Sequence, residues 1–110
     1  MQAHSKHAIR ALLCLLLAAA GTSANALDGA TLYKEKTCVS CHGENGNNPV
    51  LPAYPKLGGQ NPEYLFQQLK DIKSGVRTNA MTAAMQGIIQ NVDMEEMRVI
   101  AIWLGTLSAE

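Results

Sequence analysis

Histidine, cysteine and aromatic residues are all scarce in this 110-residue sequence. Three Cys and three His occur, none of them after residue 42, and aromatic residues make up 5% of the chain. Charge of one sign is also lacking, because nine basic residues balance nine acidic ones. The balance gives no reason to expect nucleic acid as a partner. A hydrophobic content of 47% excludes a disordered chain, and the length allows one domain.

Residues 1–26 have the pattern of a secretory signal peptide. Basic residues precede an uncharged apolar run from Ala11 to Ala20, and Ala24–Ala26 is a small-x-small cleavage site. The alternative, a retained anchor, is disfavoured because a membrane span needs roughly 20 apolar residues. Cys14 is interpreted as part of the apolar run. We therefore expect export to the periplasm, no stable membrane insertion after cleavage, and a mature domain of residues 27–110.

The chain from Leu27 onward has few large side chains with which to build a core. It holds three Tyr, one Phe and one Trp, and its seven basic and nine acidic residues give a net charge of about −2. Domains of this size often need a disulfide, a metal or another cross-link for stability. The composition therefore predicts that something besides side chains fills the interior.

Hydrophobic periodicity predicts an all-α chain with about four short helices and long loops. A first helix is expected from Asp28 to about Thr37, and residues 43–61 are rich in Gly, Pro and Asn and indicate a loop. A second helix is expected from Asn61 to Gly75, a short helical piece within 76–92, and a last helix that Asp93 caps. No alternating strand pattern occurs.

The sequence Cys38-Val-Ser-Cys41-His42 has the C-x-x-C-H spacing of c-type haem attachment. Two thiols three positions apart on one helical turn can each bond a vinyl group of the same porphyrin. The next residue, His42, then lies under the iron as the proximal ligand. Covalent attachment holds a large apolar disc in a chain too small to bury it otherwise. We therefore expect one covalent haem c.

Three other interpretations of this motif compete with haem attachment. Cys38 and Cys41 could form a structural disulfide, as is common in exported proteins. A thioredoxin-like redox pair would need a βαβ context, and the pattern contains no strand. Half of a zinc site would need a second pair of Cys or His, which the mature chain lacks. Export, small size and helical pattern together favour haem.

The sixth iron ligand has to come from a residue other than histidine, because the mature chain has no second one. Lys and Tyr are alternatives, but Met is the usual partner in electron transfer and raises the reduction potential. The candidates are Met81, Met85, Met94 and Met97. Met97 fits core packing better. Spacing alone does not separate Met81 from Met85.

In its order of motifs the mature chain resembles the class I cytochromes c, most of all the small bacterial branch that includes the two-haem c4 type. The resemblance implies the class I cytochrome c fold, wrapped around one haem because one attachment motif is present. The matching stretches are Cys38-Val-Ser-Cys-His-Gly43, Gly46-Asn47-x-Pro49, Pro55-Lys-Leu-Gly-Gly-Gln60, Tyr64-x-x-x-Gln68-Leu69-x-x-Ile72-x-x-Gly75, Arg77-Thr78-Asn79 and Ile100-Ala101-Ile102-Trp103.

The resemblance implies roles for two further residues of the haem site. In this branch the axial Met lies seven positions before the hydrophobic residue that opens the last helix. That residue is Val92, so Met85 is the expected distal ligand and Met81 the reserve. The backbone carbonyl of Pro49 is expected to accept a hydrogen bond from Nδ1 of His42, which would fix the ring. The alternative is that Pro49 is only a turn residue.

Other residues have roles that the resemblance suggests without deciding. The first helix is expected to cross the last one at Gly29. Arg77 and Lys56 would either reach a haem propionate or be solvated surface charges. Tyr64 and Leu69 would line the haem pocket or belong to the core.

The expected function is one-electron transfer on a haem that cycles between Fe(III) and Fe(II), without enzymatic activity. No second His and no paired nucleophile is present to support catalysis. The partners would be redox proteins, a donor and an acceptor that the sequence does not name. The alternative is a cytochrome subunit of a periplasmic oxidoreductase complex with a flavin or molybdenum partner. A haem sensor or enzyme with an open sixth position is disfavoured by the supply of Met.

Overall fold

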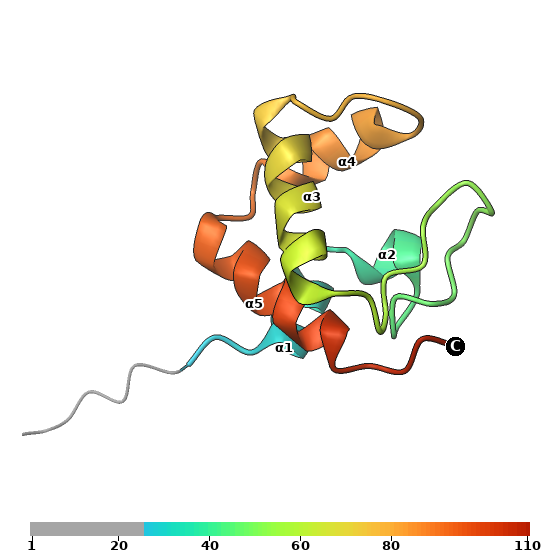
Figure 1. Ribbon diagram of the computed structural model, residues 1–110, viewed down its shortest axis with the longest axis vertical. Coiled ribbons are helices and arrows are strands. Elements are labelled where there is room, and N and C mark those ends of the chain that lie inside the picture. Colours follow the sequence, from blue (N-terminus) through green and yellow to red (C-terminus); the bar gives the residue numbers. More distant parts are fainter. Residues whose placement is uncertain (1–25) are drawn as a thin grey trace, which may run out of the picture.

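The computed structural model describes residues 26–110, which form five helices and contain no strand (Figure 1). The expected all-α class is thus confirmed, and the expected signal peptide lies outside the described residues except for Ala26. No helix within the described part combines the length and apolarity that crossing a bilayer requires. The helices are α1 Gly29–Glu35, α2 Val39–His42, α3 Pro62–Ser74, α4 Thr82–Ile89 and α5 Met94–Gly105.

The Cys-x-x-Cys-His motif forms a short helix of its own, α2, which was not among the expected helices. α1 ends at Glu35 because Thr37 adopts a left-handed conformation, with φ 66°. The amides of Thr37 and Cys38 donate to the carbonyls of Lys34 and Tyr33, both at 3.0 Å. This is a Schellman termination, which usually has glycine at the left-handed position. The helix thus ends two residues before the expected end at about Thr37.

Tyr33 connects α1 to both ends of the motif. Its side chain is fully buried, and its hydroxyl donates to the Gly43 carbonyl at 2.6 Å. Its own backbone carbonyl accepts the Cys38 amide. One residue therefore holds the first residue of the five-residue motif and the residue that follows its last.

The crossing of α1 and α5 is close, as expected, because Gly29 has no side chain. A Cβ at this position would lie 2.3 Å from Cβ of Trp103. One turn further along α1, the Tyr33 and Trp103 rings pack with their centroids 5.1 Å apart. On α5, Met97 is fully buried, which confirms its expected place in the core.

The ends of α3 and α5 follow the capping residues that the sequence predicts. The Asn61 side chain accepts the amide of Tyr64 at 3.1 Å, and Gly75 ends α3 in a left-handed conformation. Asp93 and Glu96 form a capping box at the start of α5. α3 packs across α5 on one side and against α4 on the other (Figure 1). These three helices form the wall that faces α2.

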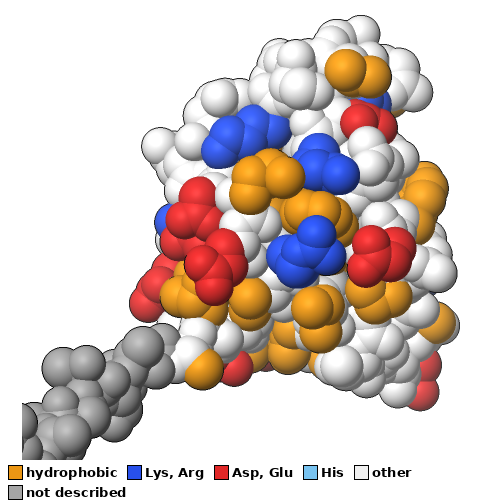
Figure 2. Space-filling model, turned by 60° about the vertical axis from the view of Figure 1, so that its left-hand side comes forward, with side chains coloured by type: hydrophobic (Ala, Val, Ile, Leu, Met, Phe, Trp, Pro, Cys, Tyr) orange, Lys and Arg blue, Asp and Glu red, His pale blue; other side chains and the backbone are white. Residues whose placement is uncertain are grey.

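The outer face over α5 and α3 carries both signs of charge among apolar side chains (Figure 2). Lys70 and Arg98 lie over the Phe66 ring, 4.6 and 4.1 Å from its centroid, and shield it from solvent. Arg98 also pairs with Glu63 at 3.8 Å. The cationic groups on this face thus cover the core.

Candidate functional site

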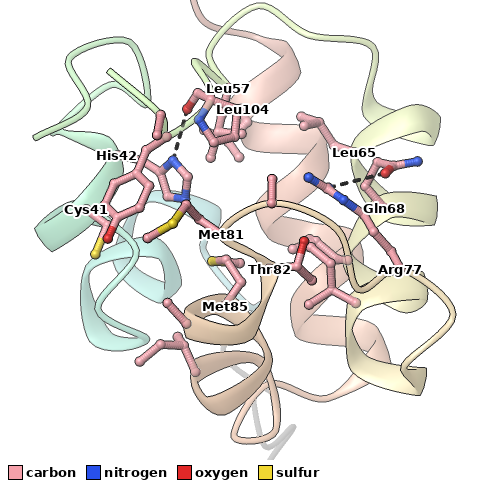
Figure 3. A pocket seen from close by; sticks show the side chains of 18 of the residues that line it. Cys41, His42, Leu57, Leu65, Gln68, Arg77, Met81, Thr82, Met85 and Leu104 are labelled. Atoms are coloured by element: carbon pink, nitrogen blue, oxygen red, sulfur yellow. Dashed lines mark hydrogen bonds between the residues drawn. The ribbon is translucent and has the colours of Figure 1, made fainter. Parts of the chain in front are cut away.

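An apolar cavity of about 300 Å³ lies between α2, the following loop and the helices α3, α4 and α5 (Figure 3). This volume is at the lower end of the roughly 300–1,000 Å³ typical of ligand pockets. Leu, Ile and Ala side chains form most of the wall. The residues with polar, sulfur or ring groups are Cys41, His42, Tyr54, Gln68, Arg77, Met81, Thr82 and Met85.

His42 lies at one side of the cavity in a fixed orientation. The residue is 4% exposed, and its Nδ1 is 3.0 Å from the carbonyl oxygen of Pro55. Since a carbonyl only accepts, Nδ1 carries the proton and Nε2 keeps its lone pair for a metal. Burial lowers the pKa of His42, against a smaller opposing effect of the Pro55 carbonyl. The ring is therefore held neutral, the form that binds iron.

The predicted role of Pro49 was wrong, because the carbonyl at His42 belongs to Pro55. The residue after Pro49, Val50, donates its amide to the Cys41 carbonyl at 3.0 Å, so the chain at Pro49 is tied to the backbone of α2. The loop comes within hydrogen-bond distance of the His42 ring only further along the chain, at Pro55. Pro49 is a residue of the loop after α2 whose carbonyl is not the partner of His42.

Cys38 caps the start of α2 and Cys41 lies within this helix, and no disulfide joins the two. Cys41 lines the cavity, and Cys38 packs against the edge of the core. Burial raises the pKa of Cys38 to about 11. Reactive redox pairs instead depend on a lowered thiol pKa, so this environment argues against a thioredoxin-like role.

Two of the four candidate methionines line the cavity wall opposite α2, and Figure 3 shows both reaching toward the His42 ring. Met85 is half-buried on α4 and packs against the core, whereas Met81 precedes α4 and is 45% exposed. Met94 is exposed. The choice of Met85 as distal ligand, with Met81 in reserve, stays a prediction.

Arg77 is the one arginine among the residues that line the cavity. Its Nη1 and Nε lie 3.3 and 3.4 Å from the amide oxygens of Gln68 and Asn79, so both partners are neutral. Lys56 is exposed and does not line the cavity. Of the two residues expected to reach a propionate, the structure therefore brings only Arg77 to the site.

Leu69 lines the cavity, as expected, but Tyr64 does not. The tyrosine is 53% exposed and borders a shallow polar hollow beside Arg77. Leu65, Phe66 and Ile72 form the buried face of α3, and position 64 lies outside that face. The expectation that Tyr64 is pocket or core was wrong.

Sequence reasoning missed three residues of this site. Pro55 supplies the carbonyl to His42, although it was already part of a quoted motif. The Tyr54 ring lies beside His42 with a centroid distance of 6.2 Å. Thr82 is buried at the start of α4, where its hydroxyl donates to the Asn79 carbonyl. A threonine in the segment expected to be helical was the sequence feature that could have indicated this hydrogen bond.

The chemistry of the cavity fits a c-type haem. The walls are apolar, Cys41 lines the cavity next to the neutral imidazole, and soft thioethers lie across from it. Cys38 stands three positions earlier, at the start of α2. Imidazole and thioether together are the ligand set of electron-transfer cytochromes. An arginine without a carboxylate partner suits an anionic substituent at the edge of an apolar group.

Comparison with known proteins agrees with this chemistry. A sequence profile of the family described as Cytochrome c matches residues 26–108. The chain is 33% identical to cytochrome c-553 of Nitratidesulfovibrio vulgaris over 95 residues, 86% of this chain and 91% of that protein. It is 37% identical to cytochrome c4 of Pseudomonas aeruginosa over 95 residues, but spans 45% of that protein's length. It is 31% identical to a thiosulfate dehydrogenase electron acceptor of Stutzerimonas stutzeri over 93 residues, 78% of this chain and 42% of that protein.

Proposed function

Because the chain belongs to the cytochrome c family and holds one covalent haem c, we propose that it is a periplasmic one-electron carrier with His42 and Met85 as axial ligands. The observation that carries the proposal is the apolar cavity with His42 at one side and two methionines at the other. We propose a carrier rather than an enzyme, exported by residues 1–26 and mature as residues 27–110.

Each residue of the site has a defined part in this function. Cys38 and Cys41 would hold the haem through thioether bonds, and the Pro55 carbonyl keeps Nε2 of His42 available for iron. Met85 would supply a thioether that tolerates both oxidation states. When bound, haem c supplies the change between Fe(III) and Fe(II). The apolar wall excludes water, which would otherwise add to the cost of changing charge.

Electrons would enter and leave through the open side of the cavity. Six of its lining residues are exposed and all are apolar: Ala53, Pro55, Ala80, Met81, Ala84 and Ile88. A rim without charges suits short encounters with redox partners, because no ion pair has to break on separation. The donor and acceptor would contact this rim.

The proposal is tested by absorption spectra of the purified protein in both oxidation states, with pyridine haemochrome and the near-infrared region included. We expect a c-type haemochrome and a weak sulfur-to-iron band in the ferric form. A haem spectrum without that band would refute methionine ligation and favour an open sixth position. Protein without haem, after expression with the attachment machinery, would refute the whole proposal.

The second candidate function is a haem-bearing partner of a sulfur-oxidising dehydrogenase. It is favoured by the relative named as a thiosulfate dehydrogenase electron acceptor. The haem chemistry of the chain would be the same, but binding would be permanent. Co-elution with a flavin or molybdenum protein at size exclusion would support it, whereas elution of the chain alone would support the mobile carrier.

Replacing Arg77 by methionine is expected to lower the reduction potential. The guanidinium faces the cavity with neutral partners only, and a nearby cation favours the reduced, less positive haem. An interaction of about 1.4 kcal/mol corresponds to about 60 mV for one electron. Potentiometric titration measures the shift. Arg77→Lys should retain most of the potential, and Lys56→Met, which alters an exposed charge, should leave it unchanged. Equal shifts in the Arg77 and Lys56 variants would contradict the assignment.

A further inference from the structure

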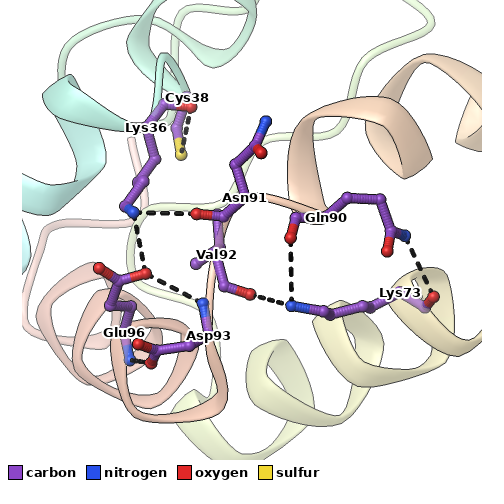
Figure 4. A network of polar contacts seen from close by, with 8 residues as sticks. All are labelled: Lys36, Cys38, Lys73, Gln90, Asn91, Val92, Asp93 and Glu96. Atoms are coloured by element: carbon purple, nitrogen blue, oxygen red, sulfur yellow. Dashed lines mark hydrogen bonds and ion pairs between the residues drawn. The ribbon is translucent and has the colours of Figure 1, made fainter.

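The turn between α4 and α5 has three consecutive carbonyl groups that two lysines bind from different helices (Figure 4). The carbonyls are those of Gln90, Asn91 and Val92, and they follow the end of α4 directly. Unpaired carbonyls past a helix end need partners, and cations near a helix C-terminus are favourable. Here the partners come from α3 and from the end of α1.

Lys73, near the end of α3, binds two of the three carbonyls. Its Nζ donates to the carbonyl of Gln90 at 3.5 Å and to that of Val92 at a shorter distance. The Gln90 side chain returns a hydrogen bond to the Lys73 carbonyl at 3.3 Å. The contact between α3 and the turn is therefore reciprocal.

Lys36, the residue that caps α1, binds the remaining carbonyl. Its Nζ donates to the Asn91 carbonyl at 2.9 Å and pairs with Glu96 at 2.9 Å. The same Glu96 oxygen accepts the Asp93 amide in the capping box of α5. Lys36 stands two residues before Cys38, so this contact ties the turn to the start of the haem-attachment motif.

α4 depends on this turn because its other support is limited. Among the described helices, α4 packs mainly against α3 and has no comparable packing against α1, α2 or α5. It carries Met85 and Ile88 on the cavity wall, and it ends at Ile89, immediately before the bound carbonyls. Any tilt of α4 would change the distance between the Met85 sulfur and the opposite wall.

We propose that Lys36 and Lys73 are positioning residues that hold α4, and with it the distal methionine, against the haem. The two lysines and the carbonyls of Gln90, Asn91 and Val92 are called the lysine clamp below. The inference rests on the proposed ligation by Met85. Without the clamp, α4 opens more often and an external ligand reaches the iron more easily.

Lys73→Met and Lys36→Met in the haem-loaded protein test the clamp, because they keep the length of the side chain and remove the ammonium group. We expect the affinity of the ferric protein for added imidazole to rise about tenfold in each variant. Amide hydrogen exchange measured by NMR should accelerate about tenfold in α4 in both variants, and in Lys73→Met it should leave α1 and α5 unchanged. A tenfold effect corresponds to about 1.4 kcal/mol, as expected for the loss of a hydrogen bond to a charged donor.

Matched controls exist on the same two helices. Lys70→Met on α3 and Lys34→Met on α1 remove a charge without touching the turn and should behave as wild type. Lys73→Arg keeps a donor and should restore most of the protection. Uniform acceleration of exchange over α1, α3 and α5, or equal effects in the Lys70 and Lys73 variants, would overturn the proposal. Absence of the sulfur-to-iron band in the wild type would instead refute Met85, while exchange in α4 would still decide the clamp.

Discussion

Replacing Met85 by alanine is expected to abolish the sulfur-to-iron band of the ferric protein and to lower its reduction potential by more than 0.1 V. The methionine is half-buried, packs against the core and faces the side of the cavity that holds His42. Loss of a thioether removes the ligand that favours the ferrous state, and axial ligands set haem potentials over roughly 0.8 V. The spectrum and a potentiometric titration measure both effects.

Met81→Ala is the matched control for this experiment. Met81 lines the same wall four residues earlier, but it precedes α4 and is 45% exposed. Its variant should keep the sulfur band and a potential near that of the wild type. The reverse pattern, with the band lost in Met81→Ala and retained in Met85→Ala, would assign the ligand to Met81.

Replacing Gly29 by alanine is expected to destabilise the fold by about 3 kcal/mol, near the upper end of typical overpacking costs. The new methyl group would lie 2.3 Å from Cβ of Trp103 and 2.8 Å from the Val99 carbonyl. Both neighbours are fixed parts of α5, so α1 would have to move away. That movement also disturbs the packing of the Tyr33 and Trp103 rings. Chemical denaturation of the haem-loaded protein measures the change.

Gly87→Ala, at another glycine within a helix, is expected to raise the stability of the fold, whereas Gly29→Ala lowers it. A Cβ at Gly87 meets nothing within 4 Å, and the residue is exposed on α4. Alanine there should stabilise the protein by about 0.5–1 kcal/mol, because glycine is the weaker helix former. A loss of stability similar in both variants would mean that the close crossing at Gly29 is not the cause.

Local signals predicted the helices of this chain well. Asn61 and Asp93 cap α3 and α5, and Gly75 ends α3, because each acts within its own turn of backbone. The first helix ends within two residues of the expected Thr37, although the Schellman termination there uses a residue that rarely adopts positive φ. The helix α2 was not predicted, because four residues are too few to show a helical period, and the expected count of about four is therefore one short.

The haem site was predictable where the chemistry is encoded in adjacent residues. Cys38, Cys41 and His42 are fixed by their spacing, whereas the carbonyl at His42 depends on the path of a loop with several prolines. Nothing local separates Pro49 from Pro55, because only the hydrogen bond from the Val50 amide to the Cys41 carbonyl shows where the loop is held against α2. For the same reason the lysine clamp, which joins residues far apart in sequence, has no signal in the sequence.

Tyr33 couples the formation of α1 to the state of the haem-attachment motif. Its carbonyl and its hydroxyl hold the chain at Cys38 and after His42, so these contacts exist only when the helix is folded. A cofactor that binds only the folded motif stabilises that state by mass action. Haem attachment therefore stabilises the first helix as well, because α1 and the motif share the contacts of Tyr33.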